Sequence, residues 1–118
     1  MMAMKPTDFD GAVPVDGYGP GFFRVGGKVI QGPVLVEQGG AQPWGGLEDR
    51  AALLALSGRI DVLFLGMGAE IAHPPADLVD ALEAVGVMVE AMASPTAART
   101  YNVTLSEGRR VACALLPL

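Results

Sequence analysis

Two short stretches of this sequence carry the residue types from which a binding site could be built. Gly66-Met67-Gly68 directly follows the apolar run 61–65 (DVLFL), and Ser94-Pro95-Thr96 follows a second apolar run, 87–92 (VMVEAM). In open α/β sheets, ligands bind at the carboxyl ends of strands, where a helix N-terminus offers free N–H groups to an anion. We call residues 66–68 and 94–99 the rim. Its predicted ligand-binding residues are Gly66, Met67, Gly68, Ser94, Thr96 and Arg99.

The same residues have a purely structural interpretation. Ser94 is a good helix N-cap with Pro95 as the first helical residue, and Arg99 is then simply exposed. Gly66-x-Gly68 lacks the third glycine of a dinucleotide-binding loop, and no helix starts promptly after it. A tight turn under a packed neighbour explains this pair equally well. The sequence leaves both interpretations open.

The side chains that define familiar reactions are scarce. The single histidine, His73, precedes Pro74-Pro75, and no G-x-S-x-G nucleophile motif is present. The single cysteine, Cys113, lies among apolar residues in VACALL, which is typical of a buried small hydrophobe. A zinc site needs several nitrogen or sulfur ligands. We therefore expect no catalytic residues, no metal site and no cofactor.

Composition restricts the class of protein. The chain has 118 residues, 51% of them hydrophobic, and a net charge of −5 with only eight Lys and Arg residues. An acidic chain repels phosphate backbones, which argues against nucleic-acid binding. No run approaches the roughly 20 apolar residues of a membrane span. The start, MMAMKPTDFDG, has no apolar region of a signal peptide, so a cytoplasmic location is expected.

The second half of the sequence predicts alternating helices and strands. Helices are expected from Leu47 to Gly58, over 76–85 and from Ser94 to Gly108, and strands over 61–65, 87–92 and 110–116. Because such crossovers are right-handed, strands 61–65 and 87–92 should be parallel neighbours or near neighbours.

The first half is rich in glycine and proline, which disfavour helices. It predicts short strands over 21–25, 28–31 and 34–37, with Gly26-Gly27 as a two-residue hairpin turn. Residues 1–12 are expected to be flexible, and 13–118 to form a single three-layer α/β domain.

Three aromatic side chains in this half are candidates for a protein contact. Exposed aromatic side chains surrounded by polar residues mark protein contact sites. Phe22, Phe23 and Trp44 are therefore the predicted contact residues. The alternative is that they are core residues beneath the β-strands of the first half of the chain.

Several segments together resemble one known family. They are GPGFFRVGG (19–27), GPVLV (32–36), Pro43-Trp44, LGMG (65–68) and, within 86–117, the pattern TYN-x-x-x-x-EGR (100–109). The chain resembles the family of the mitochondrial complex I (NADH:ubiquinone oxidoreductase) assembly factor 3, with its uncharacterised bacterial and archaeal relatives. The resemblance implies a three-layer α/β fold with a central mixed sheet, in which one strand opposes the others, flanked by helices and a small β layer. It implies no established enzymatic activity and no agreed catalytic residues.

The resemblance also indicates a function. The mitochondrial member acts as an assembly factor through protein contacts, which implies a non-enzymatic, assembly-assisting protein whose partners are respiratory-complex or membrane-assembly subunits. The chain lacks a mitochondrial presequence, as expected of a bacterial cytoplasmic protein. The alternative hypothesis is a small-molecule (anion) binder or weak enzyme that uses the rim.

Overall fold

The computed structural model describes residues 2–3 and 11–118. The predicted flexibility of residues 1–12 falls mostly on positions 1 and 4–10, which lie outside the described residues. The described elements are, in chain order, β1 (Met2–Ala3), β2 (Val15–Gly19), β3 (Phe22–Val25), β4 (Lys28–Gln31), β5 (Val34–Glu37), β6 (Gly40–Pro43), α1 (Arg50–Leu54), β7 (Val62–Gly66), α2 (Ala76–Ala84), β8 (Met88–Met92), α3 (Ser94–Ser106) and β9 (Val111–Leu115).

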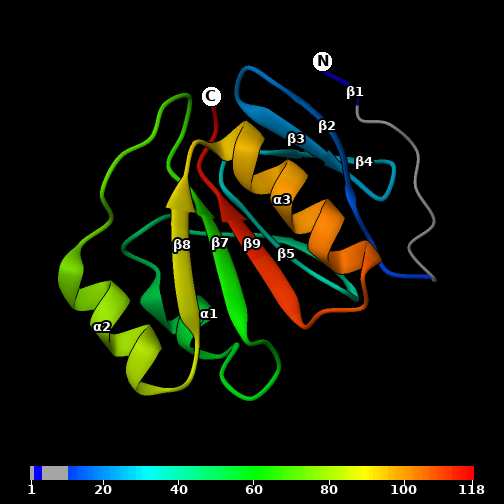
Figure 1. The fold of residues 1–118 in the computed structure, drawn as a ribbon. Helices are drawn as coiled ribbons and strands as arrows, with labels where there is room; N and C mark the ends of the chain where they lie inside the picture. Colours follow the sequence, from blue (N-terminus) through cyan, green and yellow to red (C-terminus); the bar gives the residue numbers. More distant parts are fainter. Residues whose placement is uncertain (1, 4–10) are drawn as a thin grey trace.

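A five-stranded mixed sheet forms the centre of the molecule, in the order β6-β5-β9-β7-β8 (Figure 1). Strands β7, β8 and β9 are parallel, with Leu63 opposite both Val89 and Ala112. β5 runs antiparallel to both of its neighbours, β6 and β9. One strand therefore opposes the other four, as the resemblance implied, and the predicted parallel pairing of the strands around 61–65 and 87–92 is confirmed.

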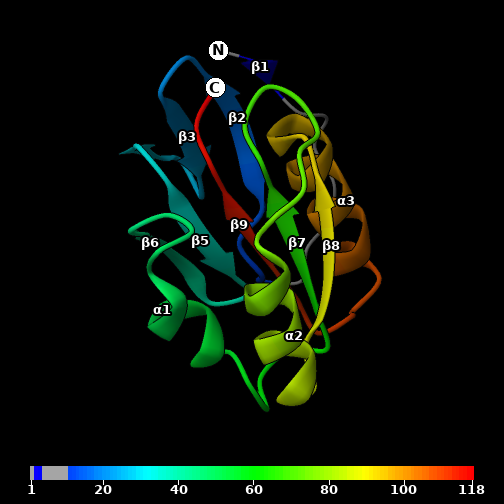
Figure 2. The ribbon, with the colours of Figure 1, turned by 90° about the vertical axis from the view of Figure 1, so that its left-hand side faces the viewer.

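Helices α1 and α2 cover one face of this sheet (Figure 2). β7 is buried along its whole length, because both of its faces are covered. Its alternate residues Leu63 and Leu65 pack with Leu78 and Leu82 of α2. The remaining buried members of this core are Leu35, Trp44, Leu53, Leu56, Ile60, Val87, Ala112 and Ala114.

Helix α3 and a small antiparallel sheet, β1-β2-β3-β4, cover the other face. The β3–β4 hairpin turns at Gly26 and Gly27, with φ of 56° and 82°, which confirms the predicted glycine turn. The buried members of this second core are Val15, Phe23, Val25, Val34, Val36, Val62, Phe64, Ala97, Ala98, Tyr101, Leu105, Val111, Cys113 and Leu115. The predicted three-layer α/β fold is thus confirmed.

Three local predictions need correction. Helix α1 spans Arg50–Leu54 and not 47–58. Before it, Asp49 closes a turn in which Gly45 N–H donates to Asp49 Oδ2 (3.1 Å), and after it residues 55–59 form turns. Strands β1, β2 and β6 were not predicted. Helix α3 is capped by the backbone of Ala93, so Ser94 is its first residue and does not make the predicted side-chain cap.

Candidate functional site

The rim residues do meet at the carboxyl ends of the strands, as predicted. β7 ends at Gly66, and a Cβ at that position would lie 2.6 Å from Ser94 Oγ and 2.8 Å from Ser94 Cα. The start of α3 therefore packs directly on the end of β7. Gly68 has φ of 102°, a left-handed conformation that favours glycine. The two glycines have separate causes, close approach at Gly66 and backbone conformation at Gly68.

The polar groups of the rim are largely bonded to one another. Ser94 is fully buried, and its hydroxyl accepts a hydrogen bond from Gly68 N–H (2.9 Å) and donates to Leu116 O (2.6 Å). Ser94 N–H donates in turn to Gly68 O (2.8 Å). These bonds tie the end of β7, the start of α3 and the chain after β9 into one junction.

The N–H groups expected to bind an anion are mostly engaged as well. Met67 N–H donates to Met92 O (2.8 Å) and Ala97 N–H to Ala93 O (2.9 Å), while Pro95 has no N–H group. Thr96 and Arg99 are exposed and contact each other, with Arg99 Nη2 donating to Thr96 Oγ1 (3.4 Å). The rim is thus chiefly a structural junction, and Thr96 and Arg99 are the predicted residues that a ligand could still reach.

Tyr101 and Asn102, from the TYN segment, anchor α3 to the small sheet. The Asn102 side chain pairs with the backbone of Val15, accepting from its N–H (2.9 Å) and donating to its C=O (2.8 Å). The Tyr101 hydroxyl donates to Val13 O (3.1 Å), and burial raises the pKa of this phenol well above its usual value. The TYN segment therefore holds α3 and the small sheet together on their shared face of the central sheet.

The predicted contact aromatics lie in different environments. Phe23 (0% exposed) and Trp44 (4%) belong to the two opposite cores, so the core alternative describes both of them. Phe22 is half-buried, and it pairs across the strands with Gly19, where a Cβ would lie 2.5 Å from its ring. Of the three side chains, Phe22 is the one that a partner protein could reach.

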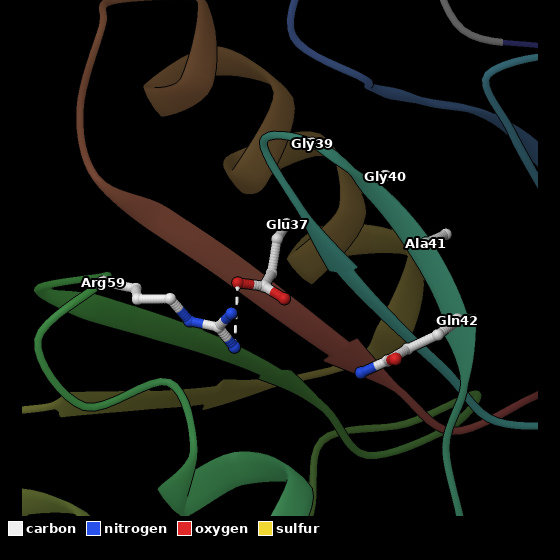
Figure 3. A pocket seen from close by; sticks show the side chains of 6 residues that line it. All are labelled: Glu37, Gly39, Gly40, Ala41, Gln42 and Arg59. Carbon is white, nitrogen blue, oxygen red and sulfur yellow. Dashed lines mark ion pairs between the residues drawn. The ribbon is translucent and has the colours of Figure 1, made fainter.

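An open polar cavity of about 340 Å³ was not predicted from the sequence. It lies between the β5–β6 hairpin and the loop after α1, and its lining includes Glu37, Gln42 and Arg59 (Figure 3). Arg59 Nη2 pairs with Glu37 Oε1 at 3.4 Å, with Arg59 57% and Glu37 26% exposed. Sequence patterns gave no signal for this pair, because its members are far apart in the chain and belong to no common motif. The pair can contact a zwitterionic or polar ligand, but the bond itself already neutralises both charges.

The reactive and metal-binding side chains of the described residues form no further site. Cys113 is fully buried, and burial raises the pKa of its thiol, so it is a neutral hydrophobic residue at neutral pH. Among the residues that the structure describes, no cluster of three or more His, Cys, Asp or Glu side chains could hold a metal ion. No helix within those residues has the length and hydrophobicity needed to cross a bilayer.

Comparison with known proteins identifies the family. Residues 15–116 match the family described as "Protein of unknown function (DUF498/DUF598)". The chain belongs to this family. An uncharacterised protein of Rhodobacter capsulatus is 56% identical to the chain, over 99% of the chain and 94% of the relative.

A second relative is named for its role in the assembly of a respiratory enzyme. The NADH dehydrogenase [ubiquinone] 1 alpha subcomplex assembly factor 3 of Danio rerio is 31% identical over 85% of this chain. The aligned region spans 62% of that assembly factor's own length. The predicted kinship with complex I assembly factor 3 is therefore confirmed.

Solved structures support the fold. A Bartonella henselae protein described as an outer membrane protein superposes with a TM-score of 0.81 at 32% identity, covering 93% of this chain and 98% of its own. A Bordetella pertussis protein described as a Mth938-like domain gives a TM-score of 0.78 at 27% identity, covering 98% and 92%. The DUF498/DUF598 chain thus has the Mth938-like fold.

Proposed function

We propose that this DUF498/DUF598 protein is a protein-binding, assembly-assisting factor for a respiratory complex, acting in the cytoplasm through surface contacts. The observation that carries the proposal is the 31% identity to complex I assembly factor 3 across 85% of the chain. That relative is named for assembly of NADH dehydrogenase, so subunits of the same enzyme class are the proposed partners.

The internal contacts support a binding role. The residues of the LGMG and TYN segments are used to join elements of the fold, as the bonds of Ser94 to Gly68 and of Asn102 to Val15 indicate. Such a scaffold keeps surface elements in fixed positions, which lowers the entropic cost of binding a partner. Exposed apolar side chains then supply contact area: Val29 on β4 (49% exposed), Val85 after α2 (42%) and Met88 on β8 (58%).

Deletion of the gene in a bacterium that carries it tests the proposed function. The expected result is less assembled NADH:ubiquinone oxidoreductase on a native gel, with its partly assembled subcomplexes enriched. Affinity capture of the tagged chain from the same cells should recover subunits of that enzyme above the level of a tag-only control. Normal assembly in the deletion strain, with none of those subunits captured, would overturn the proposal.

A further inference from the structure

Strand β8 forms an open edge of the central sheet. It is the last strand in the order β6-β5-β9-β7-β8, and no strand of the described residues pairs with its outer side (Figure 1). Met88 N–H donates to Asp61 O (3.0 Å) and Met92 O accepts from Met67 N–H (2.8 Å), so these residues direct their backbone groups toward β7. Because backbone groups alternate along a strand, those of Val89 and Ala91 point outward.

The opposite edge of the sheet is better protected. β6 ends at Pro43, which has no N–H group to offer on the outward side, and β4 packs near this strand. Natural proteins protect edge strands with proline, lysine, bulges or covering elements. β8 (MVEAM) contains neither proline nor lysine, and its single charged residue is Glu90.

Acidic side chains surround the open edge. Glu90 is exposed at the centre of β8, and Glu83 is exposed near the end of α2, the helix that leads into this strand. Glu83 also lines a shallow cavity of about 260 Å³ with Asp61 and Met88. Three ion pairs link described residues, namely Arg50–Asp77, Arg59–Glu37 and Arg110–Asp61, and none of them includes Glu83 or Glu90. A partner at this edge would therefore meet uncompensated negative charge.

The negative charge indicates which partner can pair with β8: a second copy of this chain or a basic segment of another protein. Antiparallel pairing of β8 with a second copy, centred on Glu90, would place two Glu90 side chains directly opposite each other, which is unfavourable. The net charge of −5 adds to the repulsion between copies. A strand with Lys or Arg opposite Glu90 forms instead a favourable cross-strand pair. The residue two positions along the same strand lies on the same face, where the aliphatic part of a basic side chain can pack on Met88, which is 58% exposed.

We propose that the β8 edge binds an extended, basic segment of a partner protein, which adds as a sixth strand to the central sheet. Main-chain hydrogen bonds to Val89 and Ala91 would give affinity, and contacts to Glu90, Glu83 and Met88 would give specificity, as in other cases of strand addition. This inference rests on the proposed protein-binding function and assigns it a surface and a class of partner segment.

A synthetic peptide of alternating lysine and valine, blocked at both ends, tests the edge directly. In an NMR titration of the full chain, the amides of Val89 and Ala91 should shift and become protected from exchange. A matched peptide with glutamate for lysine should bind at least tenfold more weakly. Shifts centred on another surface, or protection of Val89 and Ala91 in a dimer of the free chain, would overturn the proposal.

Matched variants separate strand addition from simple charge attraction. Ala91→Pro removes one outward N–H and should weaken the lysine peptide at least tenfold, whereas Ala41→Pro, the same change on β6, should alter affinity less than twofold. Glu90→Lys should also weaken binding tenfold, while Glu107→Lys at the far end of α3 should not. If Ala91→Pro folds and binds like the parent, or if Glu90→Lys and Glu107→Lys bind equally, the inference is wrong.

The outcomes also separate this inference from the proposed function. If respiratory subunits are captured equally by the parent and by both β8 variants, the assembly function stands and the β8 edge is not the contact surface. If the lysine peptide binds at β8 with the expected variant pattern but deletion leaves respiratory assembly normal, the edge inference stands and the assembly function fails.

Discussion

The rim and the β8 edge lie at neighbouring parts of the same sheet, yet they use their polar groups in opposite ways. At the rim, Gly68 and Ser94 bond to each other and the Ser94 hydroxyl also bonds to Leu116 O, so these amides and this hydroxyl are occupied within the chain. At the edge, Val89 and Ala91 direct their backbone groups outward, beyond the last strand of the sheet. Proximity to strand ends therefore does not by itself leave polar groups free for a ligand.

Substitution of Gly66 by alanine tests whether the rim is a tightly closed junction. The added Cβ would lie 2.8 Å from both Ser94 Cα and Leu115 Cδ2, in addition to Ser94 Oγ, and the first of these belongs to the backbone. We expect a loss of about 3 kcal/mol in the free energy of unfolding, measured by urea denaturation. Gly39→Ala is the control, because a Cβ there meets no atom within 4 Å. Equal stability of the two variants would show that the rim has room for a ligand.

Ser94→Ala addresses the hydrogen bonds of the same junction. The variant leaves Gly68 N–H and Leu116 O without the hydroxyl that joins them. Because a buried unpaired group costs about 1–3 kcal/mol, we expect unfolding free energy to fall by about 2 kcal/mol. Ser106→Ala, which removes an exposed hydroxyl bonded to Val103 O, should cost less than about 0.5 kcal/mol. A stable Ser94→Ala variant would contradict a structural role for this serine.

Tyr101→Phe tests a second internal hydrogen bond, that of the Tyr101 hydroxyl to Val13 O, and it is expected to change how stability depends on pH. Loss of the bond to Val13 O should cost about 1 kcal/mol at neutral pH. Burial raises the pKa of Tyr101 in the folded state, so above pH about 10 the unfolded chain releases a proton that the folded chain retains. The contribution of Tyr101 is therefore complete below pH about 10 and is lost as the pH rises.

Thermal unfolding between pH 8 and 11 measures this effect. The parent should lose stability more steeply above pH 10 than Tyr101→Phe does, so the difference between them narrows. Parallel curves for the parent and Tyr101→Phe would show that the phenol does not resist ionisation.

Glu90→Lys is expected to have the smallest effect on stability. Glu90 is exposed and belongs to none of the ion pairs among the described residues. The unfolding free energy should change by less than about 0.5 kcal/mol, although the same variant should strongly weaken the binding of a basic strand. A large loss of stability would mean that the β8 edge contributes to the fold and is not a free surface.

Sequence patterns predicted much of the fold because the relevant signals are local. The apolar run of β7, the period of α2 and the Gly26-Gly27 turn each specify an element within a few residues. β2 (VDGYG) was missed because its alternate glycines weaken the strand pattern. One of them, Gly19, is required by the ring of Phe22 on the neighbouring strand, a tertiary contact.

The candidate sites were predicted less well, for a related reason. The meeting of Gly68 with Ser94 follows from parallel topology, so the rim could be located from sequence. Whether its N–H groups remain free depends on exact geometry, because Ser94 begins the helix and its hydroxyl points back to Gly68 and Leu116. The Glu37–Arg59 pair and the outward direction of Val89 likewise depend on strand order and register, which local patterns do not encode.

Amide hydrogen exchange of the free, full-length chain, measured residue by residue by NMR, tests the contrast between rim and edge most directly. The account predicts slow exchange for the amides of Met67, Gly68 and Ser94, which have internal acceptors, and fast exchange for those of Val89 and Ala91. Fast exchange at Gly68 and Ser94 together with slow exchange at Val89 and Ala91 would contradict it.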